Sequence, residues 1–250
     1  MKEEIGDTIQ KMEDISLHKY GDLEIFSGQY RDKEITKKDF YLSVVWSGWG
    51  KVSSARAATR VISHKYKDTK VDLILFTGVA GSLDEGIEQK DIIVPKLLMQ
   101  YDVDVSPLFE KFVIPSLNQS YITINETFHT KVFESLCAAK ERGDLDFFGN
   151  IYDGLIGTGD QFISELSSVK KIKSEIPNIK AIEMEGAAVA QVAVQERIPC
   201  LIVRVISDNA NNDAPSSFEE FIKLYKNHSW LIIKVIVNCL YKQLNCIRDK

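Results

Sequence analysis

The sequence predicts an α/β fold in which helices pack on one central β-sheet. Short apolar runs rich in β-branched residues alternate with helical patterns over the whole length of 250 residues. No linker rich in Pro, Gly or Ser divides the chain, and 44% hydrophobic with 27% charged residues is typical of a globular protein. We therefore expect a single domain that spans residues 1–250 and is built in layers around the sheet.

Periodicity gives the positions of the individual elements. The predicted strands are 23–30, 40–48, 71–78, 91–103, 154–159, 179–183 and 200–207. The predicted helices are 51–66, 126–141, 164–175, 185–196 and 217–246. The last is expected to open with a capping box formed by Ser217 and Glu220, and to continue unbroken because apolar residues recur at helical spacing.

Composition excludes several classes of partner and location. A net charge of -5 without a basic block argues against nucleic acid as a partner. No run reaches the roughly 18 apolar residues of a membrane span, and MKEEIGDTIQ is too polar for a signal peptide. The four cysteines (Cys137, Cys200, Cys239 and Cys246) form no CxxC pair and are expected to be buried free thiols. We therefore expect a cytoplasmic protein.

The residues that follow the predicted strands are the candidates for a ligand site, because ligands of α/β sheets bind beyond the carboxyl ends of the strands. The stretch TGVAGS (77–82), which contains Gly81, allows the backbone to approach a ligand closely, although glycine at a strand end is more often part of a plain turn. The stretch TGDQFI (158–163) carries Phe162, whose ring is suited either to stack on a flat base or to fill the core.

Three carboxylates beside apolar strand ends are the strongest indication of function. Burying such a group is costly unless it is paired, so stability alone does not explain Glu183, Glu185 and Asp208. The alternatives are that Glu185 sits favourably at a helix N-terminus and that Asp208 forms an Asx turn or a cap. Glu183 is expected to pair with Arg204 on a neighbouring strand.

Six stretches, in order and spacing, resemble the bacterial 5'-methylthioadenosine/S-adenosylhomocysteine nucleosidases of the nucleoside phosphorylase superfamily. They are SGWGKV (47–52), TGVAGS (77–82), DVDVS (102–106), TGDQFI (158–163), AIEMEGAAVAQVA (181–193) and VRVISDNA (203–210). The resemblance implies a three-layer, nucleoside phosphorylase-like fold with a mixed central sheet flanked by helices. It also implies hydrolysis of the N-glycosidic bond of methylthioadenosine and S-adenosylhomocysteine, which releases adenine.

The resemblance assigns the chemistry to residues at the strand ends. Asp208 matches the acid that protonates N7 of adenine, and Ser207 would orient it. A carboxyl group can do this near neutral pH only if an apolar site raises its pKa. Glu185 matches the residue that binds the ribose hydroxyls, Met184 lies under the ribose, and Glu183 supports the site from its strand.

The same resemblance assigns the recognition of the base and of the 5' group. Phe162 would stack on adenine, the main chain of Ile163 would read the edge of the base, and Gly81 belongs to the turn that approaches the ligand. Phe218 would help to cover the 5' substituent.

A base that activates water is expected at Glu4, because MKEEIGDTIQK matches the family's acidic motif from its Met onward. Position alone would make Glu4 part of a frayed terminus. The apolar strand that precedes this motif in the family is absent from the sequence. Either the chain starts further upstream, or the protein lacks one strand of its sheet.

Three departures from the family pattern affect the expected pocket. Val79 replaces a residue that is often Ser near the water site, Trp49 stands where a smaller aliphatic residue is common, and Gln161 replaces a small residue close to the base. These changes, with the absent strand, leave open an inactive or weakly active nucleoside-binding protein.

A purine nucleoside phosphorylase is a further alternative. Phosphate binding needs several converging cationic groups, usually arginines. Only Arg56, Arg60 and Arg204 lie near any of the motifs, which disfavours that reaction.

The remaining expectations concern assembly and cofactors. Family members form homodimers in which a loop of the neighbouring subunit closes the 5' pocket, and VSPLFEKFVIP (105–115) is the matching stretch. Leu108, Phe109 and Phe112 would be exposed there in a monomer. No cofactor or metal is implied, because the reaction needs only water and acid–base groups.

Overall fold

The computed structural model describes residues 2–5, 7–32, 40–211 and 213–248, with side chains described as far as residue 243. Its mixed sheet has the strand order β6-β5-β7-β8-β4-β9. Those strands are β4 (Ile74–Ser82), β5 (Ile92–Gln100), β6 (Ile122–Thr123), β7 (Ile151–Thr158), β8 (Ile179–Glu183) and β9 (Cys200–Asp208). The sheet folds back on itself, because β5 also pairs with β9 through Ile92 and Ile93.

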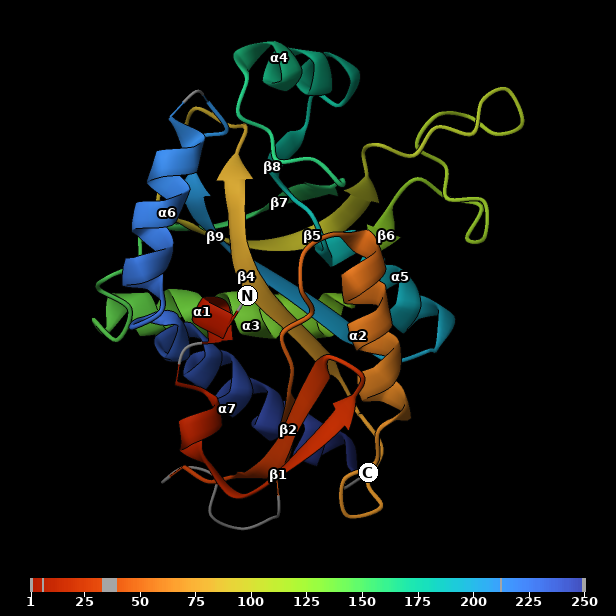
Figure 1. The fold of residues 1–250 in the computed structure, drawn as a ribbon. Coiled ribbons are helices and arrows are strands. Elements are labelled where there is room, and N and C mark those ends of the chain that lie inside the picture. Colours follow the sequence, from red (N-terminus) through yellow and green to blue (C-terminus); the bar gives the residue numbers. More distant parts are fainter. Residues whose placement is uncertain (1, 6, 33–39, 212, 249–250) are drawn as a thin grey trace.

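A second, antiparallel sheet of three strands lies beside the first (Figure 1). It contains β1 (Met12–Tyr20), β2 (Leu23–Tyr30) and β3 (Tyr41–Val44). The sequence did not predict β1, because this strand does not show a buried apolar face: Ile15 and Leu17 are both exposed, and a bulge interrupts the register between Glu13 and Ser16.

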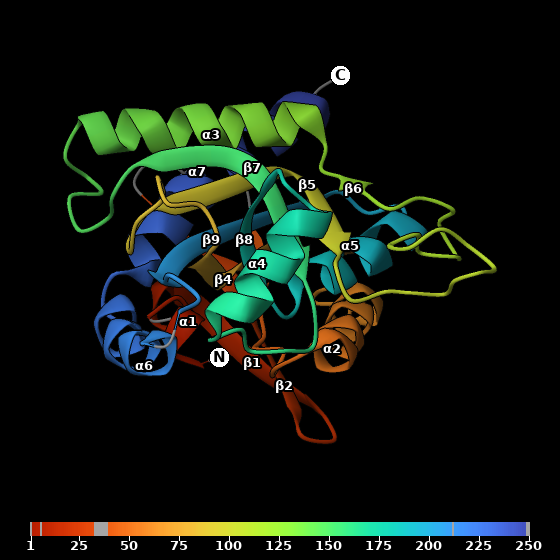
Figure 2. The same ribbon diagram turned by 90° about the horizontal axis from the view of Figure 1, so that it is seen from above.

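Helices cover both faces of the mixed sheet, so the predicted three-layer arrangement is confirmed. In Figure 2, α3 and α7 lie on one side of the strands and α2 and α5 on the other. The helices are α1 (Lys2–Ile5), α2 (Lys51–Ser63), α3 (Glu126–Glu141), α4 (Leu166–Glu175), α5 (Gly186–Gln195), α6 (Ala214–Tyr225) and α7 (Ser229–Arg248). The main core lies between these layers and is built from aliphatic residues of β5, β9, α3 and α5.

The bounds of α3 agree with the prediction, and Asn125 caps it by accepting the Phe128 N–H at 3.2 Å. The prediction of one helix over 217–246 is wrong. The chain turns at residues 226–228. There the N–H of His228 donates to the Tyr225 carbonyl, and the imidazole ring of His228 stacks on Phe147. One helix of that length would extend about 45 Å, so the turn is what lets α6 stay near the strand ends while α7 packs on α3.

The prediction of a capping box that begins at Ser217 is also wrong. The helix α6 begins at Ala214, and the Ser217 N–H donates to the Asp213 carbonyl, as expected inside a helix. Apolar residues recur at helical spacing across both the start of α6 and the turn at residues 226–228. The sequence pattern therefore showed neither of them.

Three of the cysteines, Cys137, Cys200 and Cys239, are free thiols, and only Cys137 is partly exposed. The side chain of Cys246 lies outside the described residues, as do Met1 and Gly6 of the N-terminal motif. Among the residues that the structure describes, none of the helices combines the length and apolar character needed to cross a bilayer.

Candidate active site

A cavity of about 390 Å³ lies beside β4, in the size range of pockets for small molecules. All the predicted site residues line it: Glu4, Gly81, Phe162, Ile163, Glu183, Met184, Glu185, Ser207, Asp208 and Phe218. They come from six separate parts of the chain, namely α1, the ends of β4, β8 and β9, the segment after β7, and α6. The structure therefore brings together residues as far apart in the sequence as Glu4 and Phe218.

Asp208 is the last residue of β9 and is only 5% exposed. Its carboxyl accepts hydrogen bonds from Ser207 Oγ at 2.7 Å and from the Ala210 N–H at 2.9 Å. Burial raises its pKa, and these two hydrogen bonds oppose the rise without cancelling it. The result is a fixed carboxyl group that holds its proton to a higher pH than an exposed aspartate does.

Gly81 permits this placement of Asp208. A Cβ at position 81 would lie 3.0 Å from Asp208 Oδ1, which is closer than such contacts normally are. A β-bulge between Ala80 and Gly81 occurs at the same point of the ladder with β9.

Glu183 is buried, and both of its carboxylate oxygens bind other groups of the protein. It forms an ion pair with Arg204, as predicted, and accepts hydrogen bonds from Thr158 Oγ1 and from the N–H groups of Glu185 and Gly186. Glu183 therefore caps α5 and fixes the segment that carries Glu185, while few of its lone pairs remain for a ligand.

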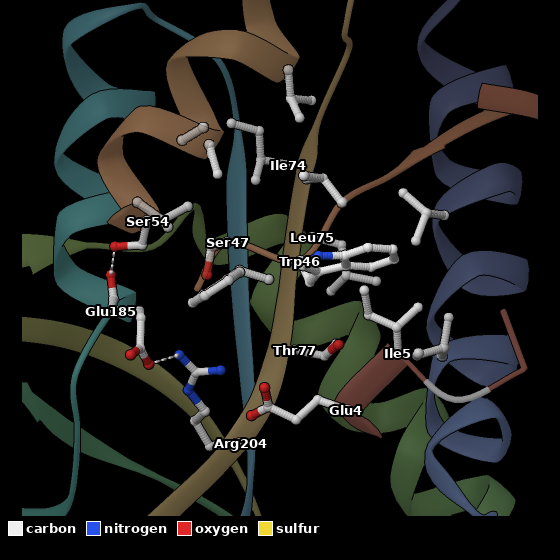
Figure 3. Close-up of a pocket in the computed structure, with 18 of the residues that line it drawn as sticks. Glu4, Ile5, Trp46, Ser47, Ser54, Ile74, Leu75, Thr77, Glu185 and Arg204 are labelled. Carbon is white, nitrogen blue, oxygen red and sulfur yellow. Dashed lines mark hydrogen bonds and ion pairs between the residues drawn. The ribbon is translucent and has the colours of Figure 1, made fainter. Parts of the chain in front are cut away.

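Glu185 does not cap α5 with its side chain, so the simple explanation of a helix-terminal carboxylate does not account for it. Its Oε1 accepts the Gly50 N–H at 2.9 Å, and Oε2 lies 3.7 Å from Arg204 Nη2. Burial and the neighbouring Glu183 raise its pKa, whereas Arg204 and the Gly50 hydrogen bond lower it. The Glu185 side chain lines the cavity, as Met184 does, and Figure 3 shows it pointing toward Arg204.

Glu4 lies on the cavity wall beside the middle of β4, where Figure 3 shows it near Thr77. The Val79 N–H donates to Glu4 Oε1 at 3.1 Å. A Cβ at position 78 would lie 2.6 Å from Glu4 Oε1 and 2.2 Å from Arg204 Nη1, so a larger residue there would displace these two side chains. Glu4 is thus held in the cavity and is not part of a frayed terminus.

The two candidate proton-transfer groups stand at different points along β4. Glu4 contacts the strand at Gly78 and Asp208 contacts it at Gly81. Three residues of strand span about 10 Å. This spacing is suited to a sugar ring with a base on one side and a water molecule on the other.

Three aromatic rings gather at the opening of the cavity. The Phe218 ring lies 5.8 Å from Phe162 and 6.1 Å from Trp49, with edge-to-face geometry in both pairs. Phe162 is 42% exposed, so it is not part of the core. These rings offer an apolar surface for a flat base or a thioether.

Sequence reasoning missed a polar network that joins the loops around this opening. Lys51 donates from its N–H to Asp160 Oδ1 at 2.8 Å and from Nζ to Asp102 Oδ1 at 2.6 Å. Asp102 also accepts the Asp160 N–H at 3.0 Å. All three residues lie in the quoted motifs, so their charges were the available signal.

In the loop at 105–115, Leu108 is 80% exposed and Phe109 is exposed, as predicted. The expectation that Phe112 is exposed is wrong, because it packs against a second core cluster near β8. In the part of the chain that the structure describes, no three His, Cys, Asp or Glu side chains are placed to hold a metal ion.

Comparison with known proteins gives consistent results over nearly the whole chain. Residues 1–240 match the family model described as the phosphorylase superfamily. The 5'-methylthioadenosine/S-adenosylhomocysteine nucleosidase of Shewanella sediminis is 32% identical over 240 residues, which is 96% of each chain.

Two solved structures illustrate the structural likeness. The same nucleosidase from Neisseria meningitidis, in complex with methylthio-immucillin-A, has a TM-score of 0.82 at 27% identity and 95% coverage of both chains. The futalosine hydrolase of Helicobacter pylori has a TM-score of 0.79 at 30% identity, covering 95% of this chain and 94% of that one.

Proposed function

This chain belongs to the 5'-methylthioadenosine/S-adenosylhomocysteine nucleosidases of the phosphorylase superfamily, and we propose how its cavity carries out their reaction. The enzyme hydrolyses the N-glycosidic bond of methylthioadenosine and S-adenosylhomocysteine. The products are adenine and the corresponding 5-thioribose. The observation that carries the assignment of roles is the pair of carboxyl groups, Asp208 and Glu4, beside different points of one strand.

Asp208 is the general acid in this proposal. It donates its proton to N7 of adenine, so that the electron pair of the breaking N9–C1' bond leaves on a neutral base. Its raised pKa supports this role, because an acid catalyst must keep its proton near the working pH. Ser207 positions the carboxyl group through their 2.7 Å hydrogen bond.

Glu4 is the general base. It takes a proton from the water molecule whose oxygen bonds to C1', which completes the balance of the reaction. Each such proton transfer contributes roughly 10²–10⁴-fold in rate. Glu185 binds the ribose hydroxyls, and its negative charge suits a sugar that develops oxocarbenium character.

Adenine stacks on Phe162 and the main chain of Ile163 binds the edge of the base, with Met184 under the ribose and Phe218 against the 5' substituent. The arrangement of Trp49, Phe162 and Phe218 around the opening supports this orientation of the substrate.

The charges of the cavity favour water over phosphate as the nucleophile. Arg56 pairs with Asp22, the guanidinium of Arg60 stacks on Tyr20, and Arg204 pairs with Glu183 and Glu185. Arg204 is thus the one of these three arginines that lines the cavity, and two carboxylates already offset its charge, which disfavours the binding of a phosphate anion.

We also propose that the protein is a homodimer and that it acts in the cytoplasm. Exposed Leu108 and Phe109 support the dimer, because such side chains are typical of an interface.

The test is adenine release from methylthioadenosine and S-adenosylhomocysteine in phosphate-free buffer. We expect release by the unaltered chain, and a loss of at least about 100-fold in both Asp208→Asn and Glu4→Gln with ligand binding retained. Glu3→Gln on the same short helix is the matched control. Release that requires phosphate would indicate a phosphorylase, and binding without release would indicate the nucleoside-binding alternative.

A further inference from the structure

The start of α2 connects two separate walls of the cavity through its main chain. The Gly50 N–H donates to Glu185 Oε1 at 2.9 Å, and the next N–H, that of Lys51, donates to Asp160 Oδ1 at 2.8 Å. Such N–H groups at the start of a helix have no partner within the helix. Glu185 follows β8, whereas Asp160 follows β7. Two successive N–H groups thus join the segment that carries the ribose-binding carboxylate to the segment that carries Phe162.

These segments approach so closely that the backbone needs glycine at position 50. Gly50 has a φ of 87°, in the left-handed region, and a Cβ there would lie 3.0 Å from Asp160 Oδ1. Ser54, one turn further along α2, donates from Oγ to the Glu185 carbonyl oxygen at 3.4 Å (Figure 3). The start of α2 is therefore fixed against Glu185 at two points.

The side chains of Lys51, Asp102 and Asp160 complete this connection, and we call these three residues the loop network. Lys51 Nζ lies 2.6 Å from Asp102 Oδ1 and 4.0 Å from Asp160 Oδ2, so one ammonium group pairs with two carboxylates. The other oxygen of Asp102, Oδ2, accepts the Asp160 N–H at 3.0 Å. Asp102 thus accepts a hydrogen bond on each oxygen, whereas an asparagine at this position could satisfy only one of the two donors.

Among the described residues that line the cavity, none belongs to the loop network, but several of its chain neighbours do line it. They are Trp49 beside Lys51, and Gln161 and Phe162 after Asp160. The network therefore acts on a ligand through the residues that it holds. Its side chains are 19%, 24% and 48% exposed, and ion pairs that are partly open to water add little stability. Its loss should alter the cavity more than the stability of the fold.

The acid and the base of the proposed reaction are held by other contacts. Asp208 accepts hydrogen bonds from Ser207 Oγ and the Ala210 N–H, and Glu4 accepts the Val79 N–H. These contacts do not pass through the loop network. Its loss should therefore weaken the binding of a nucleoside more than it slows the proton transfers.

We propose that the loop network is a positioning unit, which sets the distance between the ribose site at Glu185 and the adenine site at Phe162. Within it, the Lys51 ammonium lies between two carboxylates that would otherwise repel each other, and so holds their segments together. The inference rests on the proposed function, because that function assigns the ribose to Glu185 and the adenine to Phe162.

The test compares Asp102→Asn with Asp84→Asn as the matched control. Asp84 also accepts a lysine, Lys180, and a main-chain N–H, that of Gly86, but it connects β8 with the segment after β4. For Asp102→Asn we expect the KM for methylthioadenosine to rise by about 10-fold and kcat to stay within about 3-fold. Its Tm should stay within about 2 °C of the unaltered protein. The control should change neither KM nor kcat.

Two substitutions of Lys51 test the role of its charge. Lys51→Met leaves the two carboxylates without the ammonium group, so KM should rise by about 30-fold. About 1 M NaCl screens charges beyond roughly 3 Å and should reverse at least about half of that rise, relative to the unaltered protein at the same salt. Lys51→Arg keeps the charge and should hold KM within about 5-fold.

The other outcomes overturn the inference. Equal behaviour of Asp102→Asn and Asp84→Asn would show that the loop network does not act on the cavity. A fall in kcat at constant KM would place its effect on the chemical step. Equal losses in Lys51→Met and Lys51→Arg without recovery in salt would show a purely structural role.

Failure of the proposed function is a separate result. It would appear as no adenine release by the unaltered chain, and the dissociation constant of methylthioadenosine, measured by titration calorimetry, would then replace KM with the same expected changes. An unaltered chain that neither releases adenine nor binds methylthioadenosine would overturn both the function and the inference.

Discussion

Arg204 and Glu183 form an ion pair whose side chains are 1% and 2% exposed, so two opposite charges lie almost completely away from water. They come from β9 and β8, which are neighbours of β4 on its two sides near the cavity. A buried pair of this kind adds little net stability, but removal of one partner is costly because the other charge remains buried. The pair also orients the segment that carries Glu185.

We predict that Glu183→Gln lowers the free energy of unfolding by about 3–5 kcal/mol, since Arg204 would lose the nearer of its two counter-ions and keep only Glu185 at 3.7 Å. The expected fall in Tm is roughly 10 °C, measured by calorimetry. Glu134→Gln is the control, because Glu134 pairs with Lys131 at 3.2 Å on the surface and such pairs contribute less than about 1 kcal/mol. Equal effects of the two substitutions would contradict the assigned role of Glu183.

Replacement of Asp208 should stabilise the protein at alkaline pH. Burial raises the pKa of Asp208 in the folded state, so the favourable, protonated form is fully present below the unfolded pKa and is lost as the pH rises through the folded pKa. Asp208→Asn removes the buried charge and keeps acceptor and donor atoms in place. We expect its Tm to exceed that of the unaltered protein by about 3 °C at pH 8, with a smaller difference at pH 5. A higher Tm of the unaltered protein at pH 8 would show that the carboxylate is well compensated.

Ser207→Ala should move the pH profile of adenine release. The Ser207 hydrogen bond lowers the pKa of Asp208, so its loss raises that pKa further, and the alkaline limb of kcat shifts to higher pH. We also expect kcat to fall by about 10-fold, because the carboxyl group is less well oriented. Ser216→Ala is the control, because it removes a hydroxyl that donates to the Asp213 carbonyl. It should change neither kcat nor the position of the alkaline limb. A limb that stays in place or moves to lower pH would argue against Asp208 as the acid.

The double substitution Leu108→Asp with Phe109→Asp should convert a dimer to a monomer, because charged side chains disfavour an apolar interface. Light scattering after size-exclusion chromatography measures the mass. Leu17→Asp, at an exposed position of β1, is the control and should keep the mass of the unaltered protein. An unaltered chain that is already monomeric would refute the dimer.

The sequence alone determined the α/β class, the mixed sheet, the family and the list of residues around the cavity. Local patterns were sufficient to predict α3 and most strands, because these elements bury an apolar face. The family was identified from short motifs such as EMEGAAVA and RVISDNA, which contain the candidate site residues and follow one another in the family's order. Such signals are contained in neighbouring residues, which is why they can be read without coordinates.

Only the tertiary structure decided how those residues act together. The turn at residues 226–228 depends on the packing of α7 against α3, and the exposed strand β1 is held by pairing with β2 and not by its own pattern. The support given by Glu183, the raised pKa of Asp208 and the position of Glu4 beside Gly78 all depend on burial and on contacts between distant segments. Burial and long-range contact are properties of the folded chain, so no local stretch of sequence specifies them.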